Sequence, residues 1–501
     1  MNNNNQIKLT ITDIIKYNGG IEQWNKGDVI SISAGTGTGK SHFIKNSLHD
    51  YAKQSNSKIL FLVHRLSCMN QFNNELVRDN KQDTIHIKTY QAIESLVKKK
   101  KHFDFTPYDY IVCDEFHYFI SDSLFNKTTD LSLESIISQH DKTRIFMSAT
   151  GDIMENYLKG FNKINIRKYT IQPNYDFINH LSFYSKDHTL ETIIENAINK
   201  KDKTIVFIDN AKKAFELHNK FRKHSIFNCS QNNYTYKKYI SNEVNEIYEK
   251  EKFKSLILIT TNAMDAGINI IDSDLKNVIC DIRDIDVLIQ CIGRKRIINP
   301  NDYINLTIKA LSNQQIGRIN SNLSKQFKHA KYLKNNDTEA YVNEYYRNLD
   351  VNNGIVYDEL VNGKIEKKIN MLAYYKYISD VVTFKGMIDK YGKYAYCKYM
   401  ANKFNKRYSI IEEGNKMNEL ETYLESIVGK KLLKEEQKEL IETIGLKDAR
   451  GRLQKGFKSL NTYFEENKLR YTITPRKSGS VRFWKVYHTD NLGQLVDKAI
   501  K

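Results

Sequence analysis

Cysteine is scarce in this sequence, and the few cysteines show none of the spacings used for covalent or metal cross-links. Six cysteines occur among 501 residues, without a C-x-x-C pair and without a His/Cys cluster at zinc-ligand spacing. Because disulfide frameworks and zinc knuckles depend on such spacings, neither is predicted. A reducing, cytoplasmic location fits this composition best.

Long apolar runs are also missing. No stretch approaches the roughly 20 apolar residues that a membrane-spanning helix needs. The opening residues, MNNNNQ, lack the apolar core of a signal peptide. We therefore expect a soluble protein that has no membrane partner and is not exported.

Acidic residues are fewer than basic ones. The chain has 59 Asp and Glu against 77 Lys and Arg, a formal charge of +18. Such a charge favours a polyanionic partner, nucleic acid above all. Proline and tryptophan are rare, at 4 and 2, whereas tyrosine reaches 32. Because an AT-rich coding sequence supplies Asn, Ile, Lys and Tyr, codon bias is an alternative source of part of the positive charge.

The stretch AGTGTGKS, residues 34–41, follows the apolar run of residues 29–32 and precedes a helix-like segment. Its glycines allow positive φ, so that successive N–H groups can converge on one anion at the start of the helix. The lysine can then reach terminal phosphates, and the serine hydroxyl can bind Mg²⁺. An ordinary glycine-rich turn is the alternative. We assign ATP binding to the whole loop: Ala34, Gly35, Thr36, Gly37, Thr38, Gly39, Lys40 and Ser41.

Two acidic residues follow another strand-like run. Residues 110–113 (YIVC) predict a buried strand, and Asp114 and Glu115 come directly after it. Beside a phosphate loop, Asp114 can hold Mg²⁺ through water, while Glu115 can orient and deprotonate the water that attacks the γ-phosphate. A purely structural role is disfavoured because adjacent carboxylates repel each other.

Further strand ends carry residues suited to a nucleic-acid backbone. Residues 58–63 and 85–88 each predict a strand. Arg65 follows the first, and Thr89 and Tyr90 follow the second. We expect these three residues to contact nucleic acid, although helix capping or surface charge explains them as well.

A last strand of this series, residues 143–147, ends in the small hydroxyl residues Ser148 and Thr150. Such residues can hydrogen-bond the acidic motif and sense the state of the nucleotide. The tripeptide SAT says little by itself, and its value lies in its order and position.

The ordered motifs resemble the motor core of superfamily 2 helicases of the DExH kind. AGTGTGKS, HRLSCMNQ, KTYQ, DEFH and SAT follow one another in the family's order, each behind a strand-like run. TIVFID begins a second series near residue 204, and TNAMDAGINI and VLIQCIGRKR match later motifs of the family. Alanine as the first residue of the loop, where the strict pattern has glycine, is the variant seen in helicase-like motors.

The resemblance implies a set of site residues beyond those already named. Asp265 and Gly267 would lie beside the nucleotide, Gln290 would act in catalysis, and His117 would couple the acidic motif to Ser148 and Thr150. Thr260 and Thr261 would help to hold the nucleic acid.

The final motif departs from its commonest form. A second arginine usually follows the GR arginine by three residues, but residue 297 is isoleucine. Arg294 is our first choice for the finger that stabilises γ-phosphate charge, and Arg296 is the second. Spacing leaves open which of them points into the site.

From about residue 301 the motifs stop. Helical spacing continues from 311 to 350 and from 369 to 405, where tyrosines can stack on bases but more often pack. Near the end, three helices (420–428, 434–444 and 449–467) and two strands (469–473 and 481–487) resemble a winged helix. Basic residues would lie on its third helix (Arg450, Arg452, Lys455 and Lys458) and on its wing (Arg476, Lys477 and Arg482).

The predicted fold is α/β, with two tandem RecA-like parallel-sheet lobes, a mainly helical region and a small α+β domain that resembles a winged helix. Its length agrees with several domains. We place the lobes at 1–170 and 171–310, the helical region at 311–414 and the winged-helix-like, nucleic-acid-binding domain at 415–501.

The expected function is an ATP-dependent helicase or translocase of superfamily 2, with ATP and Mg²⁺ as cofactors and DNA favoured over RNA. The composition suits replication or repair in a bacterium, phage or mobile element. A second interpretation is an ATPase that acts as a nucleic-acid-binding or remodelling switch without separating strands. A metabolic kinase is disfavoured by the second lobe.

Overall fold

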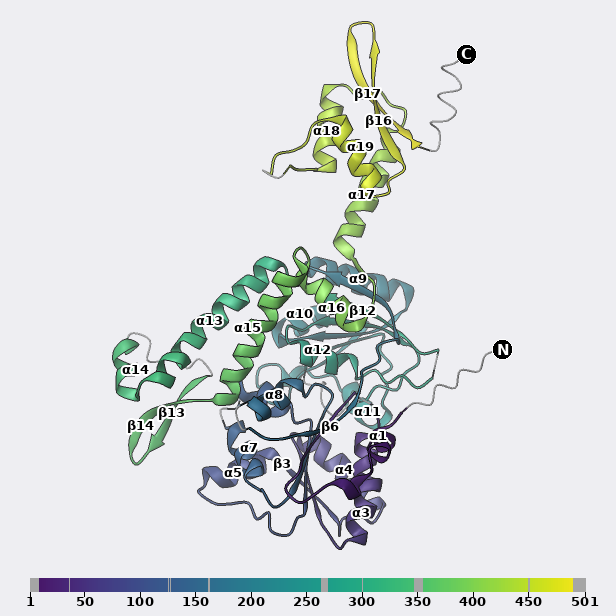
Figure 1. Ribbon diagram of the computed structural model, residues 1–501. Helices are drawn as coiled ribbons and strands as arrows, with labels where there is room; N and C mark the ends of the chain where they lie inside the picture. The colour runs from purple at the N-terminus through teal and green to yellow at the C-terminus, as the bar shows by residue number, and fades with distance from the viewer. Residues whose placement is uncertain are drawn as a thin grey trace. The chain divides into compact units, whose positions relative to one another are not determined.

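The computed structural model describes residues 9–35, 37–124, 126, 128–160, 163–262, 269–299, 301–346, 355–448 and 451–489. Contacts divide the chain into two compact units, Met1–Tyr408 and Ser409–Lys501. The first holds two parallel sheets and a helical region, and the second is a small α+β unit (Figure 1). This arrangement confirms the predicted fold class.

The first sheet has six parallel strands in the order β3-β2-β4-β5-β1-β6. They are β1 (Val29–Ala34), β2 (Ile59–Val63), β3 (Ile85–Thr89), β4 (Tyr110–Asp114), β5 (Thr143–Ser148) and β6 (Arg167–Ile171). Side chains alternate along each strand, so Ile30 and Ile32 enter one core and Val29 enters another on the opposite face. Burial on both faces explains the continuous apolar runs that predicted these strands.

Helices cover both faces of this sheet. They begin with α1 (Ile11–Tyr17), α2 (Lys40–Phe43), α3 (His49–Gln54), α4 (Leu66–Arg78) and α5 (Tyr90–Lys98). Then come α6 (Tyr118–Ser121), α7 (Thr129–Ile137) and α8 (Asp152–Gly160). A π-helical segment, Ile44–Leu48, joins α2 to α3.

The second sheet has seven strands in the order β15-β7-β12-β11-β8-β10-β9. They are β7 (Ile178–Tyr184), β8 (Lys203–Ile208), β9 (Ser225–Asn228), β10 (Ile257–Thr260), β11 (Leu275–Asp281), β12 (Ile304–Lys309) and β15 (Tyr408–Ile410). Its helices include α9 (Asp187–Lys200), α10 (Ala211–Lys220), α11 (Glu243–Lys250) and α12 (Ile285–Ile292). Parallel strands bring their carboxyl ends to one rim, which is where such sheets bind ligands.

The region after the second sheet is mainly helical, as predicted. It contains α13 (Asn313–Asn335), α14 (Thr338–Glu344), α15 (Met371–Tyr391) and α16 (Ala395–Phe404). Helices α13 and α15 lie side by side (Figure 1). Tyr374, Tyr377 and Tyr396 are buried, which confirms packing as the role of these tyrosines.

An antiparallel hairpin in this region was not predicted. Strands β13 (Val356–Val361) and β14 (Lys364–Ile369) meet at Asn362 and Gly363, both of which have positive φ. Asn-Gly between two short runs is a strong hairpin signal, because a type I′ turn needs positive φ at both central residues. The sequence therefore contained the information that the helical interpretation passed over.

The second unit packs three helices against a hairpin. These are α17 (Ile411–Ile427), α18 (Lys434–Ile444), α19 (Phe457–Glu466), β16 (Tyr471–Ser478) and β17 (Val481–His488). Leu424, Leu440, Leu460, Phe464 and Val486 form the centre of its core.

The ends of two helices in this unit differ from prediction. Helix α17 begins earlier, and α19 begins only at Phe457 instead of residue 449. Arg452 and Lys455 therefore precede α19 instead of lying on it, and Arg450 is outside the described residues.

None of the helices in the described part of the chain is long and apolar enough to cross a bilayer.

Candidate active site

The loop after β1 has the conformation of a phosphate cradle. Gly37 and Gly39 have φ of 77° and 86°, a region that side-chain-bearing residues rarely adopt, whereas Gly35 does not have positive φ. Lys40 begins α2 and is buried, and its Nζ donates to the carbonyl oxygens of Ala34 at 2.6 Å and Gly35 at 3.0 Å. Thr36 lies outside the described residues.

Helix α1 supports this loop from the side. The Ile11 N–H donates to the Thr38 carbonyl at 3.1 Å, and the Thr38 hydroxyl donates to the Gly35 carbonyl at 2.7 Å. Ser41, the second residue of α2, is exposed, so its hydroxyl is open to a ligand at the loop.

Asp114 and Glu115 lie at the carboxyl end of β4. Glu115 has a φ of 49°, which is uncommon for a residue with a side chain and typical of functional sites. The Phe116 N–H donates to the Met147 carbonyl at 3.1 Å and holds this turn against β5.

The pKa values of the two carboxyl groups are shifted in opposite directions. Burial, with the neighbouring Glu115, raises the pKa of Asp114 to about 7. Burial alone would raise the pKa of Glu115 too, but the adjacent His117 and the charges of Lys40 and Arg294 outweigh it and hold that pKa well below its usual value. Glu115 is therefore the carboxyl of the pair that loses its proton more readily.

His117 joins the acidic motif to both lobes. Its Nδ1 lies 2.9 Å from the Ser148 hydroxyl and 3.3 Å from Glu115 Oε2. Its Nε2 lies 2.7 Å from the amide nitrogen of Gln290, which comes from α12 of the second lobe. With the proton on Nδ1, His117 donates to the Ser148 hydroxyl and accepts at Nε2 from the Gln290 amide.

Thr150 completes this network. The Thr150 N–H donates to the Ser148 hydroxyl at 3.0 Å, and the Gln290 amide donates to the Thr150 hydroxyl at 3.4 Å. The structure thus brings together four residues that the sequence analysis named from three separate motifs.

Arg294 and Arg296 enter the same region from a short extended segment. Ile270 pairs with Lys295, so residues 294 and 296 share one side of the segment and Lys295 faces the other. Lys295 is 3% exposed and forms an ion pair with Asp302 at 2.5 Å. This ion pair holds the segment in place.

The two arginines carry unpaired buried atoms. Among the described residues, Arg294 Nε and Arg296 Nη1 are buried without a hydrogen-bond partner. Arg296 Nε donates to Asn269 Oδ1 at 2.7 Å, and its Nη1 lies 3.8 Å from where a Cβ on Gly37 would be. Burial and the nearby Arg294 lower the pKa of Arg296 to about 10. Buried donors of this kind indicate an anionic ligand.

A cavity of about 960 Å³ lies between the lobes. The phosphate loop lines it from the first lobe, and Gln290, Gly293 and Arg296 line it from the second. Tyr175, Phe177 and Tyr303 provide apolar surface at the same cavity.

The structure places the predicted nucleic-acid contacts at strand ends, mostly below the surface. Arg65 is half-buried and its Nε donates to His64 Nε2 at 3.2 Å, while Thr89 caps α5. Tyr90 is 0% exposed, stacks on Tyr118 and donates to the Asp114 carbonyl at 2.9 Å. Tyr90 therefore supports the acidic motif in this structure.

In the second lobe, Thr260 and Thr261 are buried at the end of β10. The Thr260 hydroxyl accepts from Asn228 Nδ2 at 3.1 Å. Asp265 and Gly267 lie outside the described residues.

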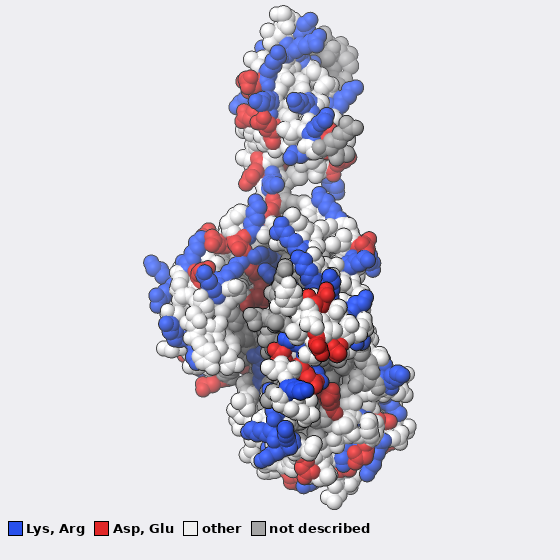
Figure 2. All heavy atoms as spheres, turned by 90° about the vertical axis from the view of Figure 1, so that its left-hand side faces the viewer, with Lys and Arg blue, Asp and Glu red and all other residues white. Residues whose placement is uncertain are grey.

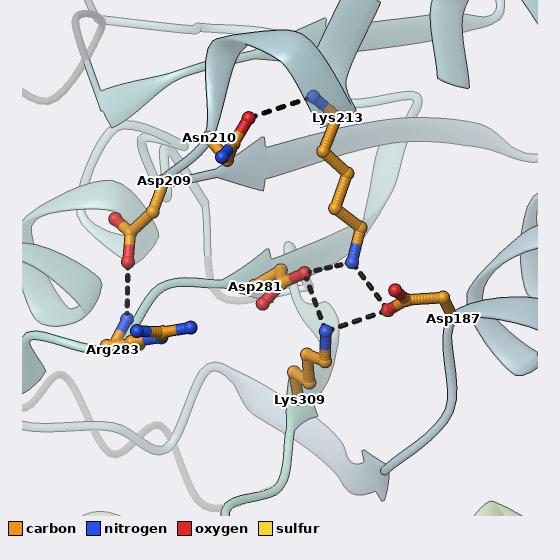
Figure 3. Close-up of polar contacts among 7 residues, drawn as sticks. All are labelled: Asp187, Asp209, Asn210, Lys213, Asp281, Arg283 and Lys309. Carbon is orange, nitrogen blue, oxygen red and sulfur yellow. Dashed lines mark hydrogen bonds and ion pairs between the residues drawn. The ribbon is translucent and has the colours of Figure 1, made fainter. Parts of the chain in front are cut away.

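A second polar cluster lies at the carboxyl ends of β11 and β12 in the second sheet (Figure 3). Lys213 Nζ lies 2.6 Å from Asp187 and 2.5 Å from Asp281, and Lys309 lies 2.7 Å and 3.2 Å from the same two carboxylates. The charges balance one another, so this cluster ties α9, α10, β11 and β12 together. Its Asp209 accepts from the Arg283 N–H at 2.8 Å, just before α12.

Gly151 is a site residue that sequence reasoning missed. A Cβ at this position would lie 2.5 Å from the Phe116 ring, so only glycine lets the segment after Ser148 pass the acidic motif. Glycine directly after SAT was the available signal.

No protein-family model matches this chain, and no curated protein does. Among solved structures, it is similar to Mss116p bound to ssRNA and AMP-PNP, with 18% identity and a TM-score of 0.42. That match covers 57% of this chain and 66% of the other, just under two thirds of it.

Two further solved structures have comparable similarity. Dbp5 of S. cerevisiae, bound to RNA and ADP BeF3, gives 16% identity and a TM-score of 0.43 over 60% of this chain and 81% of that one. A DEAD box protein from Methanococcus jannaschii gives 16% identity and a TM-score of 0.33 over 60% and 85%.

Replacing Gly151 by alanine is expected to destabilise the first lobe by about 1–3 kcal/mol, because the added methyl overpacks against Phe116. Urea unfolding measures the change. Gly160→Ala is the matched control, since nothing lies within 4 Å of a Cβ there. Equal stability of the two variants would contradict the close packing at Gly151.

Proposed function

We propose that the chain is an ATP-dependent nucleic-acid motor of superfamily 2, DExH kind. The observation that supports this most is the meeting of two half-sites in one cleft. The first lobe contributes a phosphate loop and an acid pair, and the second contributes Arg294 and Arg296, each with a buried nitrogen that has no hydrogen-bond partner among the described residues. A kinase with a single lobe has no need of the second half.

The residues suit a nucleoside triphosphate with Mg²⁺. Lys40 and the backbone of residues 37–40 would bind the terminal phosphates, and the arginine donors would be satisfied by the γ-phosphate. Ser41 and Asp114 would hold Mg²⁺, which neutralises charge on the β- and γ-phosphates when bound. Asp265 and Gly267 remain proposed contacts of the nucleotide.

Within this proposal each protein group has a distinct task. Glu115, charged at neutral pH, orients the attacking water and accepts its proton. Arg294 and Arg296 share one face of their segment, and both would stabilise charge that develops on the γ-phosphate. Gln290 and His117 couple hydrolysis to lobe closure, because their hydrogen bond exists only while the lobes are in contact.

The nucleic acid would lie across the strand ends of both lobes. Arg65, at the start of α4, is the predicted contact with the most accessible side chain, and Thr89, Thr260 and Thr261 would contribute through backbone or after rearrangement. DNA is the proposed substrate and RNA the alternative, in a cytoplasmic replication or repair process. A remodelling switch would show ATPase activity in a strand-displacement assay without displacing a strand.

We also propose that the second unit is a winged-helix-like module that binds nucleic acid through its hairpin. Residues 468–488 carry Lys and Arg but no Asp or Glu, and Figure 2 shows basic side chains over this hairpin. Lys477 lies directly opposite Arg482 across the strands. Such a like-charge pair is destabilising by itself, which favours a polyanion as partner.

The hairpin suits phosphates better than bases. Arg476, Lys477 and Arg482 are exposed, whereas Phe483 is buried and Trp484 packs against Phe457. The aromatic rings of these two strands are buried or half-buried, whereas the cations are exposed, which favours contact with the sugar-phosphate backbone.

Lys40→Ala is expected to lower the nucleic-acid-stimulated kcat by about 100-fold or more, because it removes the buried cation of the phosphate loop. ATPase rates with single-stranded DNA, duplex DNA and RNA, measured in parallel, test the reaction and its substrate together. Lys53→Ala, at an exposed site on α3, is the control. If Lys40→Ala kept the full nucleic-acid-stimulated ATPase activity, the assignment of this loop to ATP hydrolysis would be wrong.

Loss of the finger arginine is expected to lower kcat by about 10³-fold or more. Arg294→Ala and Arg296→Ala, assayed separately by steady-state ATPase kinetics, identify which residue fills that role. Arg222→Ala, an exposed arginine of the second lobe, should behave as the wild type. If both site variants kept at least about a third of the activity, neither arginine would be a finger.

Replacing Arg476, Lys477 and Arg482 together by glutamine is expected to weaken duplex binding and to reduce the slope of log affinity against log salt by about 2 to 3. Fluorescence anisotropy of labelled duplex DNA over a salt series measures this slope. The control replaces exposed Lys434, Lys438 and Lys447 by glutamine, with the same change in net charge. An equal effect of both triple variants would show general attraction instead of a hairpin site.

A further inference from the structure

Helix α15 begins inside the first lobe. Asn370 caps it by accepting from the N–H groups of Leu372 and Ala373, both at 3.1 Å, and its Nδ2 donates to the Ser123 carbonyl at 3.2 Å. Leu372 is fully buried in the core of the first lobe, and Tyr375 packs edge-on against Tyr157. The first turn of α15 is therefore part of that lobe.

The same helix contacts the second lobe through Lys376. Its Nζ lies 3.0 Å from Asp284 Oδ2, and 2.9 Å from Asp380 Oδ1 one turn along α15. Burial alone lowers the pKa of Lys376, but the two carboxylates outweigh it and hold that pKa above its usual value, so the side chain is charged. A buried ammonium needs such partners.

Asp284 is also the N-cap of α12. Its Oδ1 accepts from the N–H groups of Asp286 at 2.9 Å and Val287 at 3.1 Å, while its Oδ2 forms the ion pair with Lys376. Helix α12 ends in the part of the chain that presents Gln290 to His117 and leads to Arg294. Because a helix of eight residues is only about 12 Å long and stiff, a shift at its cap moves the Gln290 end as well.

The far end of α15 leads into the second lobe. Helix α16, which follows it, buries Tyr396 completely near Phe183 of β7, and Phe404 packs edge-on against Tyr175. The segment from α15 to α16 is therefore a second connection between the lobes, in addition to the chain between β6 and β7.

We propose that Lys376 is a positioning residue that holds α12 against the first lobe, so that α15 sets the distance between the arginine segment and the phosphate loop. Asp380 gives Lys376 a partner that does not depend on the second lobe, and the contact with Asp284 can therefore break and re-form as the lobes open and close. The effect on catalysis rests on the proposed function, whereas the effect on lobe spacing rests on these contacts alone.

The kinetic test compares three variants of the full chain. Lys376→Met keeps the length of the side chain without its charge and is expected to lower kcat for ATP about 10-fold to 100-fold, with KM for ATP within about threefold of wild type. Lys376→Arg keeps the charge and is expected to retain most of the activity. Asp380→Asn leaves the contact with Asp284 in place and is expected to be close to wild type.

Two kinetic outcomes would overturn the proposal. One is an unchanged kcat in Lys376→Met. The other is an equal loss in Asp380→Asn, which would assign to Lys376 only the stability of α15. Thermal unfolding of each variant excludes a general loss of fold as the cause of reduced kcat.

A structural readout separates this proposal from the proposed function. Spin labels at exposed Lys53 of the first lobe and Lys200 of the second, each changed to cysteine in a Cys68→Ser background, report the distance between the lobes. Lys376→Met is expected to shift that distance distribution to longer values, and Lys376→Arg is expected to leave it unchanged. A wild type without ATPase activity would reject the proposed function, whereas an unchanged distribution in Lys376→Met would reject the positioning role.

Discussion

The contact between Gln290 and His117, at 2.7 Å, is the one on which the candidate site depends. It joins a helix of the second lobe to the acidic motif of the first, and it exists only when the carboxyl rims of the two sheets face each other. The features of the site that combine residues of both lobes require the same approach. Because α12 is held next to His117, Arg296 lies close to Gly37 of the phosphate loop. Residues of both lobes then line the cavity between them.

Buried charge gives this cleft its chemical character. Lys40, Arg294 and Arg296 are withdrawn from water together with Asp114 and Glu115. Burial makes each of these groups costly alone, and mutual attraction offsets only part of that cost, which leaves donors on the arginines unsatisfied. An anion that carries several oxygens would both compensate the buried positive charge and accept hydrogen bonds from the unsatisfied arginine donors. The buried Lys295 differs from these arginines because Asp302 pairs with its charge.

Much of the fold followed from local pattern. Apolar runs of strand length marked β1, β2, β4 and β5 because parallel strands are buried on both faces, and the residues just past them lie at the carboxyl rim of the sheet. The hairpin at Asn362 and Gly363 was equally readable and was passed over. The start of α19 was not readable, since basic residues at helical spacing precede it in a loop.

The sequence by itself determined the two sheets, the phosphate loop, the acid pair and the order of the motifs, because these depend on periodicity and on neighbours along the chain. Only the tertiary structure decided which groups share the cleft. Tyr90 had the sequence character of a nucleic-acid contact, yet stacking on Tyr118 buries it. Arg296 occupies the site although no arginine stands at the usual spacing, because an extended segment turns alternate residues to one side. Lys376 carried no sequence signal, since its partner Asp284 is distant in the chain and burial alone gives the pair its strength.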